Sequence, residues 1–452
     1  MIKPWKIIVV LLFILNAFLN FYHAGFPELR GDETVPYIAL LPFFHFLSAG
    51  RFVPTFLVFY HEPLQMAIQL PVIIFGASEF WVRLPNILSG VLTFVILYKI
   101  GRLLWEEGLL TVVLLALYTF SGFFLLNRLS IDVGVMVFLI SLVIYFLLVP
   151  ARRAALVVWL IADFVFIDTI FLLPGIIAAR FVKLKQAVRY LIFLAVLMSI
   201  WFLIEYCASA ISGAYDWRTV APYRIFHRGS SFSFSSLVSN WEVILEYNHR
   251  IYATAILALL SLSLFEPKVR KIWVLFILPL LFFGFVKTPT VHLYLFLPLI
   301  LILATGGVGW LIKKRILGWV TVAILTGVLV VNFTFVWHKV NGLSYKGYKA
   351  VGTFVRENVP VCDKVYTDID GYAFRFYFNR AYTNNINDSF NYAIIETNTP
   401  DKLASEAGAV FSLNGLNVYK KGYHNKPISN GEFNPVYFQA ENMLSYVAKC
   451  QK

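Results

Sequence analysis

Hydrophobic residues are gathered in long blocks along the chain, separated by short stretches that carry Lys and Arg. A helix needs about 20 mostly apolar residues to cross roughly 30 Å of hydrocarbon. The blocks do not show the residue-by-residue alternation of a transmembrane barrel. We therefore predict an α-helical polytopic membrane protein with about eleven transmembrane helices, at residues 5–22, 82–101, 108–126, 134–150, two short spans within 154–181, 190–208, 250–266, 272–286, 290–311 and 316–337.

The basic residues between the blocks predict the orientation, because Lys and Arg are enriched in cytoplasmic loops. Lys3 and Lys6 precede the first block, which predicts a cytoplasmic amino terminus. The apolar run at 64–76 is too short for a span, so we predict that 23–81 is one external loop carrying membrane-lying helices. With 209–249 as a second external loop, the basic clusters all fall inside, at Arg152–Arg153, Lys183–Arg189, Lys268–Lys271 and Lys313–Arg315. A cleaved signal peptide is the alternative for the first block, but no A-x-A cleavage pattern follows it.

The character of the chain changes after residue 337, where short apolar runs alternate with Gly, Asn, Asp and Tyr. We predict a transmembrane domain over 1–337 and a small α/β domain over 338–452, which the odd number of spans places outside the cell. Within it, the spacing predicts helices at 348–359 and 401–408 and strands at 365–369, 373–379, 392–396 and 410–414.

Composition agrees with this class: 59% of the residues are hydrophobic, 14% are charged and the mean hydropathy is +0.73. Soluble domains have roughly 45–50% apolar and 25% charged residues. The net charge of +13 does not indicate nucleic-acid binding, because the basic residues lie at the ends of apolar blocks. The three cysteines have no zinc-site spacing, and at most one disulfide, Cys362–Cys450, is compatible with an external domain.

Two polar motifs lie in the first predicted external loop. Asp32 and Glu33 follow the first span, where a carboxylate could accept a proton from an attacking hydroxyl. Their alternative role is to cap the following helix. His61 and Glu62 could contact a phosphate or bind a divalent ion, although a helix start before Pro63 would also explain them.

Three further groups fall at the same predicted membrane face. Arg128 and Asp132 are four residues apart between two spans and could pair with each other or contribute to an acceptor site. Lys287 and His292 flank the start of a later span, and with Arg83 they could stabilise a phosphate group, although a lysine there could also snorkel. In the loop 209–249, charged residues such as Arg224 lie among aromatics, which suits either sugar contacts or interfacial anchoring.

In this order, the stretches resemble the GT-C glycosyltransferases of the protein O-mannosyltransferase and lipid A aminoarabinose transferase superfamily. The resemblance covers about residues 1–300, and its motifs are GDE at 31–33, HEPL at 61–64, FGASEFWVRLPNILSGVLTFVILYKIGR at 75–102, the Arg-x-x-x-Asp at 128–132 and VKTPTVHLYLFLPLI at 286–300. Two departures concern the phosphate contacts: Val35-Pro36 stand where some relatives carry a basic residue, and Glu62 stands where Pro or Lys is common.

The resemblance implies inverting transfer of a hexose, mannose-like sugar or aminopentose from a polyprenyl phosphate of the undecaprenyl or dolichyl type. The acceptor would be a protein, lipid or glycan at the external face, and no metal would be obligatory, although a divalent ion is possible. The implied roles are general base for Asp32, further acidic groups for Glu33 and Asp132, phosphate contacts for Lys287, Arg83, His61 and His292, and acceptor or sugar contacts for Arg128, Tyr37, Glu62 and Arg224.

A polytopic transporter or lipid flippase is the alternative from another functional class. Such a protein would have ionisable residues within its spans, lining a substrate path. Here the spans hold few of them, chiefly Asp163, Asp168 and Glu205, while the candidate residues gather at one face. This distribution favours the transferase.

Overall fold

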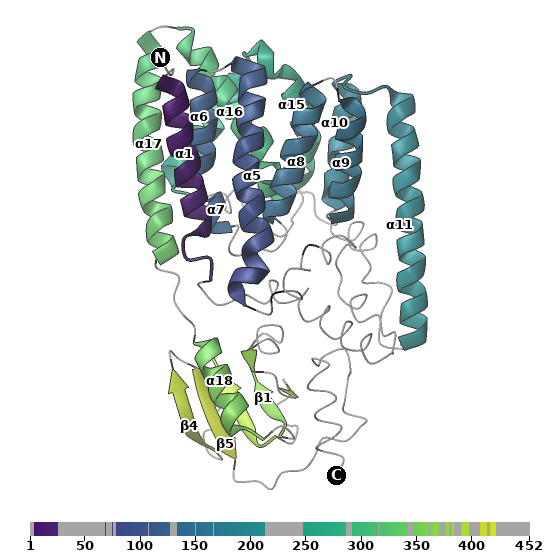
Figure 1. Cartoon of the computed structure of the whole chain (residues 1–452), viewed down its shortest axis with the longest axis vertical. Helices are drawn as coiled ribbons and strands as arrows, with labels where there is room; N and C mark the ends of the chain where they lie inside the picture. The colour runs from purple at the N-terminus through teal and green to yellow at the C-terminus, as the bar shows by residue number, and fades with distance from the viewer. Residues whose placement is uncertain are drawn as a thin grey trace.

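The computed structural model shows a helical bundle, formed between residues 4 and 341, and a carboxyl-terminal part that contains one helix and a sheet (Figure 1). The residues that the structure describes are 4–25, 68, 75, 78–106, 108–126, 133–149, 151–165, 167–212, 247–285, 292–314, 316–341, 347–360, 363–369, 377–378, 382–383, 390–396, 407–413 and 416–421.

The helices of the bundle follow one another along the chain with short connections at several points. They are α1 (Pro4–Phe21), α5 (Glu79–Trp105), α6 (Leu109–Thr119), α7 (Phe123–Leu126), α8 (Val133–Leu148), α9 (Arg152–Val165), η2 (Ile167–Phe171), α10 (Leu172–Ala178), α11 (Leu184–Ser212), α14 (Arg250–Ser263), η4 (Pro267–Val269), α15 (Arg270–Phe285), η5 (His292–Phe296), α16 (Leu297–Ile312) and α17 (Ile316–Asn341).

Every apolar block predicted to be a span contains helix, so the multi-pass helical architecture is confirmed. Among the described residues, four helices are long and apolar enough to cross a membrane: Pro4–Phe21, Glu79–Trp105, Tyr294–Ile312 and Gly318–Asn341. A fifth span results if Arg250–Ser263 and Pro267–Leu281, which meet at 96°, are counted as one broken span. The number eleven stays a prediction, and most of the predicted external loops 23–81 and 209–249 lies outside the described residues.

The core of the bundle is built around α16. Every residue from Leu297 to Gly309 is buried. Gly307 lies so close to α14 that a Cβ atom there would be 2.1 Å from the Leu259 carbonyl oxygen. Small residues allow such close backbone approach between transmembrane helices. The TGGVG sequence thus explains why this late helix occupies the centre.

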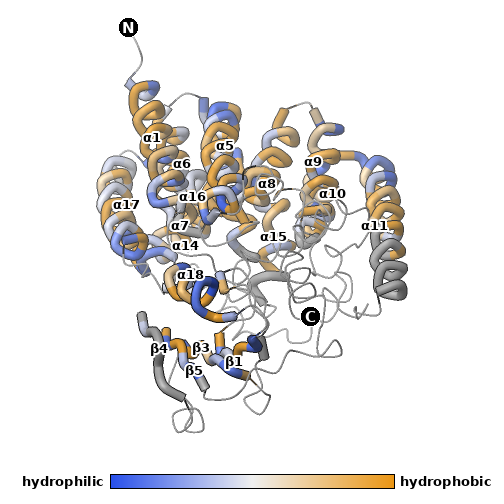
Figure 2. Tube along the Cα trace, turned by 60° about the horizontal axis from the view of Figure 1, so that its bottom comes forward, coloured by the Kyte–Doolittle hydropathy of each residue, from blue (hydrophilic) through white to orange (hydrophobic). Residues whose placement is uncertain are grey.

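The outer surface of the bundle is apolar as well. Large hydrophobic side chains are exposed on several helices, including Leu11 on α1, Ile192 on α11 and Ile324 on α17. Figure 2 shows hydrophobic colouring along the middle of these helices and hydrophilic colouring toward helix ends. Lipid hydrocarbon solvates such a surface and water does not. The chain is a multi-pass membrane protein.

The carboxyl-terminal part contains α18 (Tyr348–Asn358) and a five-stranded sheet in the order β2-β1-β3-β5-β4. The strands are β1 (Val365–Thr367), β2 (Tyr382–Thr383), β3 (Tyr392–Ile395), β4 (Ala407–Leu413) and β5 (Leu416–Lys421). β1 runs parallel to β2 and β3, whereas β5 runs antiparallel to β3 and β4. One face of α18 packs on the sheet through Val351 and Val355, which are fully buried.

The sequence predicts part of this arrangement. Helix 348–359 and the strands at 365–369, 392–396 and 410–414 coincide with α18, β1, β3 and β4. The strand predicted at 373–379 is wrong where it is described, because Tyr377 is helical, Phe378 lies in a turn, and both are buried in one cluster. The helix predicted at 401–408 is wrong at its end, where Ala407 and Gly408 pair with β5. Cys362 and Cys450 lie outside the described residues.

Candidate active site

Most residues that the sequence singles out lie outside the part of the chain that the structure describes. Arg83 is described in full, and His292 opens η5 with only its backbone described. The others are Asp32, Glu33, Tyr37, His61, Glu62, Arg128, Asp132, Arg224 and Lys287. The geometry of the site therefore rests on Arg83 and on the helix ends that adjoin these segments in sequence.

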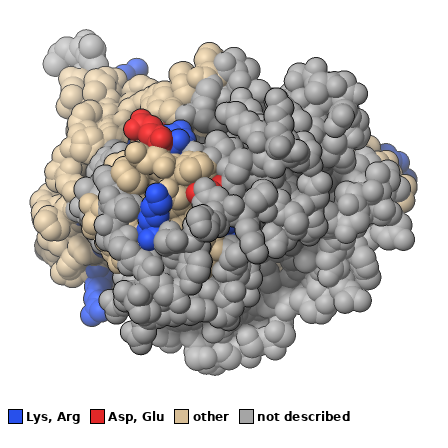
Figure 3. Space-filling view, turned by 90° about the horizontal axis from the view of Figure 1, so that it is seen from below, with Lys and Arg blue, Asp and Glu red and all other residues tan. Residues whose placement is uncertain are grey.

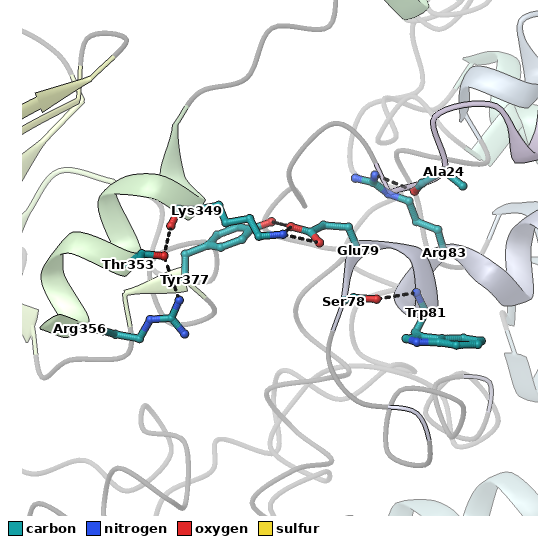
Figure 4. Close-up of polar contacts among 9 residues, drawn as sticks. All are labelled: Ala24, Ser78, Glu79, Trp81, Arg83, Lys349, Thr353, Arg356 and Tyr377. Atoms are coloured by element: carbon teal, nitrogen blue, oxygen red, sulfur yellow. Dashed lines mark hydrogen bonds and ion pairs between the residues drawn. The ribbon is translucent and has the colours of Figure 1, made fainter.

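Arg83 lies near the start of α5, and its guanidinium is buried, with 1% of the residue exposed. The Ser78 side chain caps this helix by accepting a hydrogen bond from the Trp81 backbone N–H at 3.4 Å. Arg83 Nη1 donates to the Ala24 carbonyl oxygen, just beyond α1, at 3.3 Å (Figure 4). A guanidinium carries five N–H donors and a permanent charge. In an apolar bundle, such a group is suited to stabilise an anion.

Asn86, one turn further along α5, connects this helix to α8. Its Oδ1 accepts a hydrogen bond from the Val135 backbone N–H at 3.2 Å, and only 1% of Asn86 is exposed. The first turn of a helix leaves its N–H groups without partners inside the helix. Asn86 thus caps α8 from a neighbouring helix. Asp132 is the residue directly before α8 in sequence.

Asn248 joins three other elements. Its Oδ1 accepts a hydrogen bond from the Gly122 backbone N–H at 2.8 Å, and its Nδ2 donates to the Tyr294 hydroxyl at 2.8 Å. Gly122 directly precedes α7, Asn248 lies before α14, and Tyr294 belongs to η5. Tyr294 also packs edge-on against Tyr247, with ring centroids 5.7 Å apart.

These contacts bring together the helix ends that adjoin the four stretches in which the candidate residues other than Arg83 lie: 23–81, 128–132, 209–249 and 287–292. The end of α1 meets the start of α5, the start of α5 meets the start of α8, and α7 meets α14 and η5. Figure 1 shows that this end of the bundle faces the carboxyl-terminal part, whereas the amino terminus lies at the opposite end. The convergence of the ends agrees with the single predicted face. The individual roles stay predictions, because the side chains of the candidates other than Arg83 are not described.

The carboxyl-terminal part contacts the same turn of α5. Glu79 is buried and accepts hydrogen bonds from Lys349 Nζ at 3.4 Å and from the Tyr377 hydroxyl at 3.3 Å (Figure 4). Val82, 1% exposed, belongs to the same hydrophobic cluster as α18 and the sheet, and Trp81 packs against that cluster. The start of α5 is therefore an interface between the bundle and the carboxyl-terminal part.

The described part of this face carries charges of both signs. Seen from the end of the carboxyl-terminal part, acidic and basic side chains lie next to each other in Figure 3. Among the described residues, no group of three His, Cys, Asp or Glu side chains could hold a metal ion. The sequence resemblance implies that no metal is obligatory, and this stays a prediction.

Sequence reasoning identified Arg83 but not Asn86, Asn248, Asn332 or Tyr294. One signal was available for Asn332, which stands in the apolar run VVNFTF of α17. A polar amide in such a run is costly unless it is hydrogen-bonded, so it indicates a buried partner. The sequence does not reveal the partner, because Asn332 and Asn248 are 84 residues apart.

A family model agrees with the sequence resemblance over part of the chain. Residues 64–173 match the family described as dolichyl-phosphate-mannose-protein mannosyltransferase. This segment includes Arg83 and Asn86 as well as Arg128 and Asp132. No curated protein sequence matches the chain.

Solved structures agree over nearly the whole chain. One similar structure is the crystal structure of ArnT from Cupriavidus metallidurans bound to undecaprenyl phosphate. Its sequence is 13% identical to this chain, the TM-score is 0.63, and the match covers 93% of this chain and 98% of that one. For the apo state of the same protein the identity is 13%, the TM-score is 0.61 and the coverage is 92% and 97%. These findings confirm the resemblance seen in the sequence. The chain has the fold of ArnT, and its residues 64–173 match the model of the dolichyl-phosphate-mannose-protein mannosyltransferase family.

Proposed function

We propose that the chain is a membrane glycosyltransferase that moves a sugar from a polyprenyl phosphate to a protein, lipid or glycan acceptor. The observation that carries this proposal is the place of the family-matched segment in the fold. It supplies Arg83 and Asn86 to the end of the bundle where the helix ends beside the other candidates converge. The fold shared with a structure that contains undecaprenyl phosphate supports a donor of that chemical class.

In the proposed reaction, Asp32 accepts the proton of an acceptor hydroxyl as that oxygen attacks the anomeric carbon. The bond between this carbon and the phosphate oxygen breaks, its electron pair stays on the phosphate, and the configuration inverts. Arg83 and Lys287, with His61 and His292, stabilise the charge that develops on the leaving phosphate.

The remaining candidates are assigned to binding. Glu33 and Asp132 complete the acidic side of the pocket, while Arg128, Tyr37, Glu62 and Arg224 contact the sugar or the acceptor. Because the leaving group is a phosphate held by cations of the chain, the reaction has no obligatory metal.

The proposed orientation places Arg83 at the external face. Arg102, in the last turn of α5, and Arg152, at the start of α9, belong to the helix ends away from Arg83, where Figure 2 also shows hydrophilic colouring. Lys and Arg are enriched on the cytoplasmic side. The amino terminus is then cytoplasmic, and the carboxyl-terminal part is extracytoplasmic.

The activity is tested with purified protein reconstituted in vesicles with undecaprenyl-phosphate-linked hexoses and aminopentoses. The assay follows release of undecaprenyl phosphate and incorporation of the sugar into added membrane glycolipids, glycans or proteins. Asp32→Asn should lower turnover by about 10²- to 10⁴-fold, the usual contribution of a general base. Glu357→Gln, on the exposed side of α18, is the control of the same chemistry.

Two outcomes would count against the proposal in different ways. Wild-type protein that releases no polyprenyl phosphate from these donors contradicts the function. Near wild-type turnover of Asp32→Asn contradicts only the role of Asp32. The orientation is tested separately, by labelling Tyr345→Cys in intact cells after replacing Cys207, Cys362 and Cys450 by Ser. Labelling that requires permeabilisation would contradict the external carboxyl-terminal part.

A further inference from the structure

A closed network of buried amides lies at the same end of the bundle as Arg83. Asn248 accepts hydrogen bonds from Gly122 N at 2.8 Å and from Asn332 Nδ2 at 3.0 Å, and it donates to the Tyr294 hydroxyl. The exposed fractions of Asn248, Asn332 and Tyr294 are 2%, 0% and 2%. These three side chains are therefore buried inside the protein.

Asn332, in α17, extends the network to two backbone groups. Its Nδ2 donates to the Phe120 carbonyl oxygen at 2.7 Å, and its Oδ1 accepts from the His249 backbone N–H at 2.6 Å. Phe120 and His249 lie where α6 ends and where α14 begins. The two asparagines thus provide partners for backbone groups at breaks between helices, which would be costly to leave unpaired in an apolar bundle.

The geometry of the network is tightly constrained. The Gly122 N–H can only donate, so it fixes which end of the Asn248 amide faces α7 and leaves Nδ2 for Tyr294. A Cβ at Gly122 would lie 1.9 Å from the Tyr247 carbonyl oxygen, so the two chain segments touch directly. A change at Asn248 or Tyr294 is therefore transmitted to several helix ends at once.

We propose that Asn248 and Tyr294 are positioning residues for the glycosyl transfer proposed above, on which this inference rests. The three elements that Asn248 joins adjoin three candidate segments in sequence. Gly122 and α7 precede Arg128 and Asp132, Asn248 follows the segment with Arg224, and Tyr294 follows Lys287 and His292. The network fixes the spacing of the anchor points from which these segments start.

Three buried tyrosines allow a matched test of this proposal. Tyr294→Phe removes the hydroxyl that accepts from Asn248. Tyr252→Phe removes a hydroxyl that donates to the Leu117 carbonyl oxygen, and Tyr118→Phe removes one that donates to the Gly90 carbonyl oxygen. Tyr252 and Tyr118 are 3% and 2% exposed. Each variant loses a buried hydrogen bond described above, but only Tyr294 lies in the network.

We expect the three variants to lower the thermal unfolding midpoint by similar amounts in detergent. Only Tyr294→Phe should reduce kcat, by roughly tenfold to a hundredfold, because a displacement of 1 Å can cost about 10²-fold in rate. Tyr252→Phe and Tyr118→Phe should keep kcat near the wild-type value. Equal kcat in all three variants overturns the proposal. A Tyr294→Phe protein that fails to fold while the other two fold also overturns it, since the network is then a folding requirement.

Rescue by a conservative variant provides an independent readout. Asn248→Asp keeps the oxygen acceptors for Gly122 and Asn332, and the Tyr294 hydroxyl can turn to donate to it. Asn248→Leu keeps the approximate size but removes every polar contact. We expect Asp to retain most of kcat and Leu to lose it; equal losses overturn the proposal. Wild-type protein without transfer activity would instead contradict the proposed function.

Discussion

The Lys349 ammonium lies 3.4 Å from the Glu79 carboxylate, joining α18 to the first turn of α5 across 270 residues of sequence. Glu79 is buried and also accepts from Tyr377, while about half of the Lys349 side chain is exposed, at 54%. Solvent around the exposed Lys349 ammonium screens this ion pair and weakens its contribution to stability. The apolar contacts of Val82 and Trp81 add to the attachment in the described part of the interface.

Reversing the charge of Lys349 should loosen this attachment. Lys349→Glu places a second carboxylate beside the buried Glu79, and we expect faster proteolysis within residues 342–346. Adding Glu79→Lys should slow the cleavage again by restoring an opposite pair. Arg356→Glu, on the exposed face of the same helix, is the control. Identical cleavage of Lys349→Glu and wild type would show that the ion pair does not hold the interface.

Arg83→Gln should lower kcat/KM for the polyprenyl-phosphate sugar by about 10²- to 10³-fold, the usual cost of losing one preorganised electrostatic contact. Arg83→Lys should recover part of the activity because it keeps the charge. Arg102→Gln, at the other end of α5, should have no effect on turnover, since Arg102 is exposed and stacks on Tyr98. A steady-state assay of the three purified variants measures this. Equal activity of Arg83→Gln and Arg102→Gln would remove Arg83 from the site.

Two glycines should respond in opposite ways to alanine. Gly307→Ala places a Cβ 2.1 Å from the Leu259 carbonyl oxygen, so α14 and α16 must separate and the thermal midpoint should fall. Gly327→Ala, in α17, meets nothing within 4 Å and should stabilise the protein by roughly 0.5–1 kcal/mol through helix propensity. Thermal unfolding in detergent compares them. A midpoint for Gly307→Ala at or above that of Gly327→Ala would contradict the close packing of α16.

Alkaline pH should destabilise the carboxyl-terminal part. Burial, and secondly the charge of Asp368, raises the pKa of the Tyr366 phenol above its ordinary value of 10.0. The folded state therefore holds this proton more tightly, and its contribution to stability is complete below pH 10 and is lost as the pH rises through the raised pKa. Tyr366→Phe, which keeps the ring that stacks on Phe390, should flatten the loss of stability above pH 10. An unchanged pH profile for this variant would assign the effect to another group.

The bundle was largely predictable because the thickness of the hydrocarbon sets the length of the apolar blocks. The block 108–126 shows what this signal lacks: the structure divides it into α6 and α7 around Ser121 and Gly122. That break depends on Asn248, which is 126 residues away from Gly122 in sequence. In the sheet, β5 was missed and the end of the helix predicted at 401–408 was wrong, because the pairing of β4 with β5 decides both.

Only some residues of the candidate site could be predicted from the sequence. Arg83 stood out because it is a cation at the membrane face that the sequence predicts to be external. Asn86 and Asn248 did not, since their importance lies in backbone groups of other helices. A single sequence reports residue types and spacing, whereas these two residues are defined by their partners.

The central place of α16 has a consequence for biogenesis. The helix that fills the middle of the bundle is made after most of the helices that contact it, including α6, α8, α14 and α15. Those helices enter the membrane before α16 is made. Until then, residues such as Leu259 lack the surface of α16 on which they pack. Completion of the bundle therefore follows translation of residue 312, and a ribosome that stalls earlier leaves a set of inserted helices without their centre.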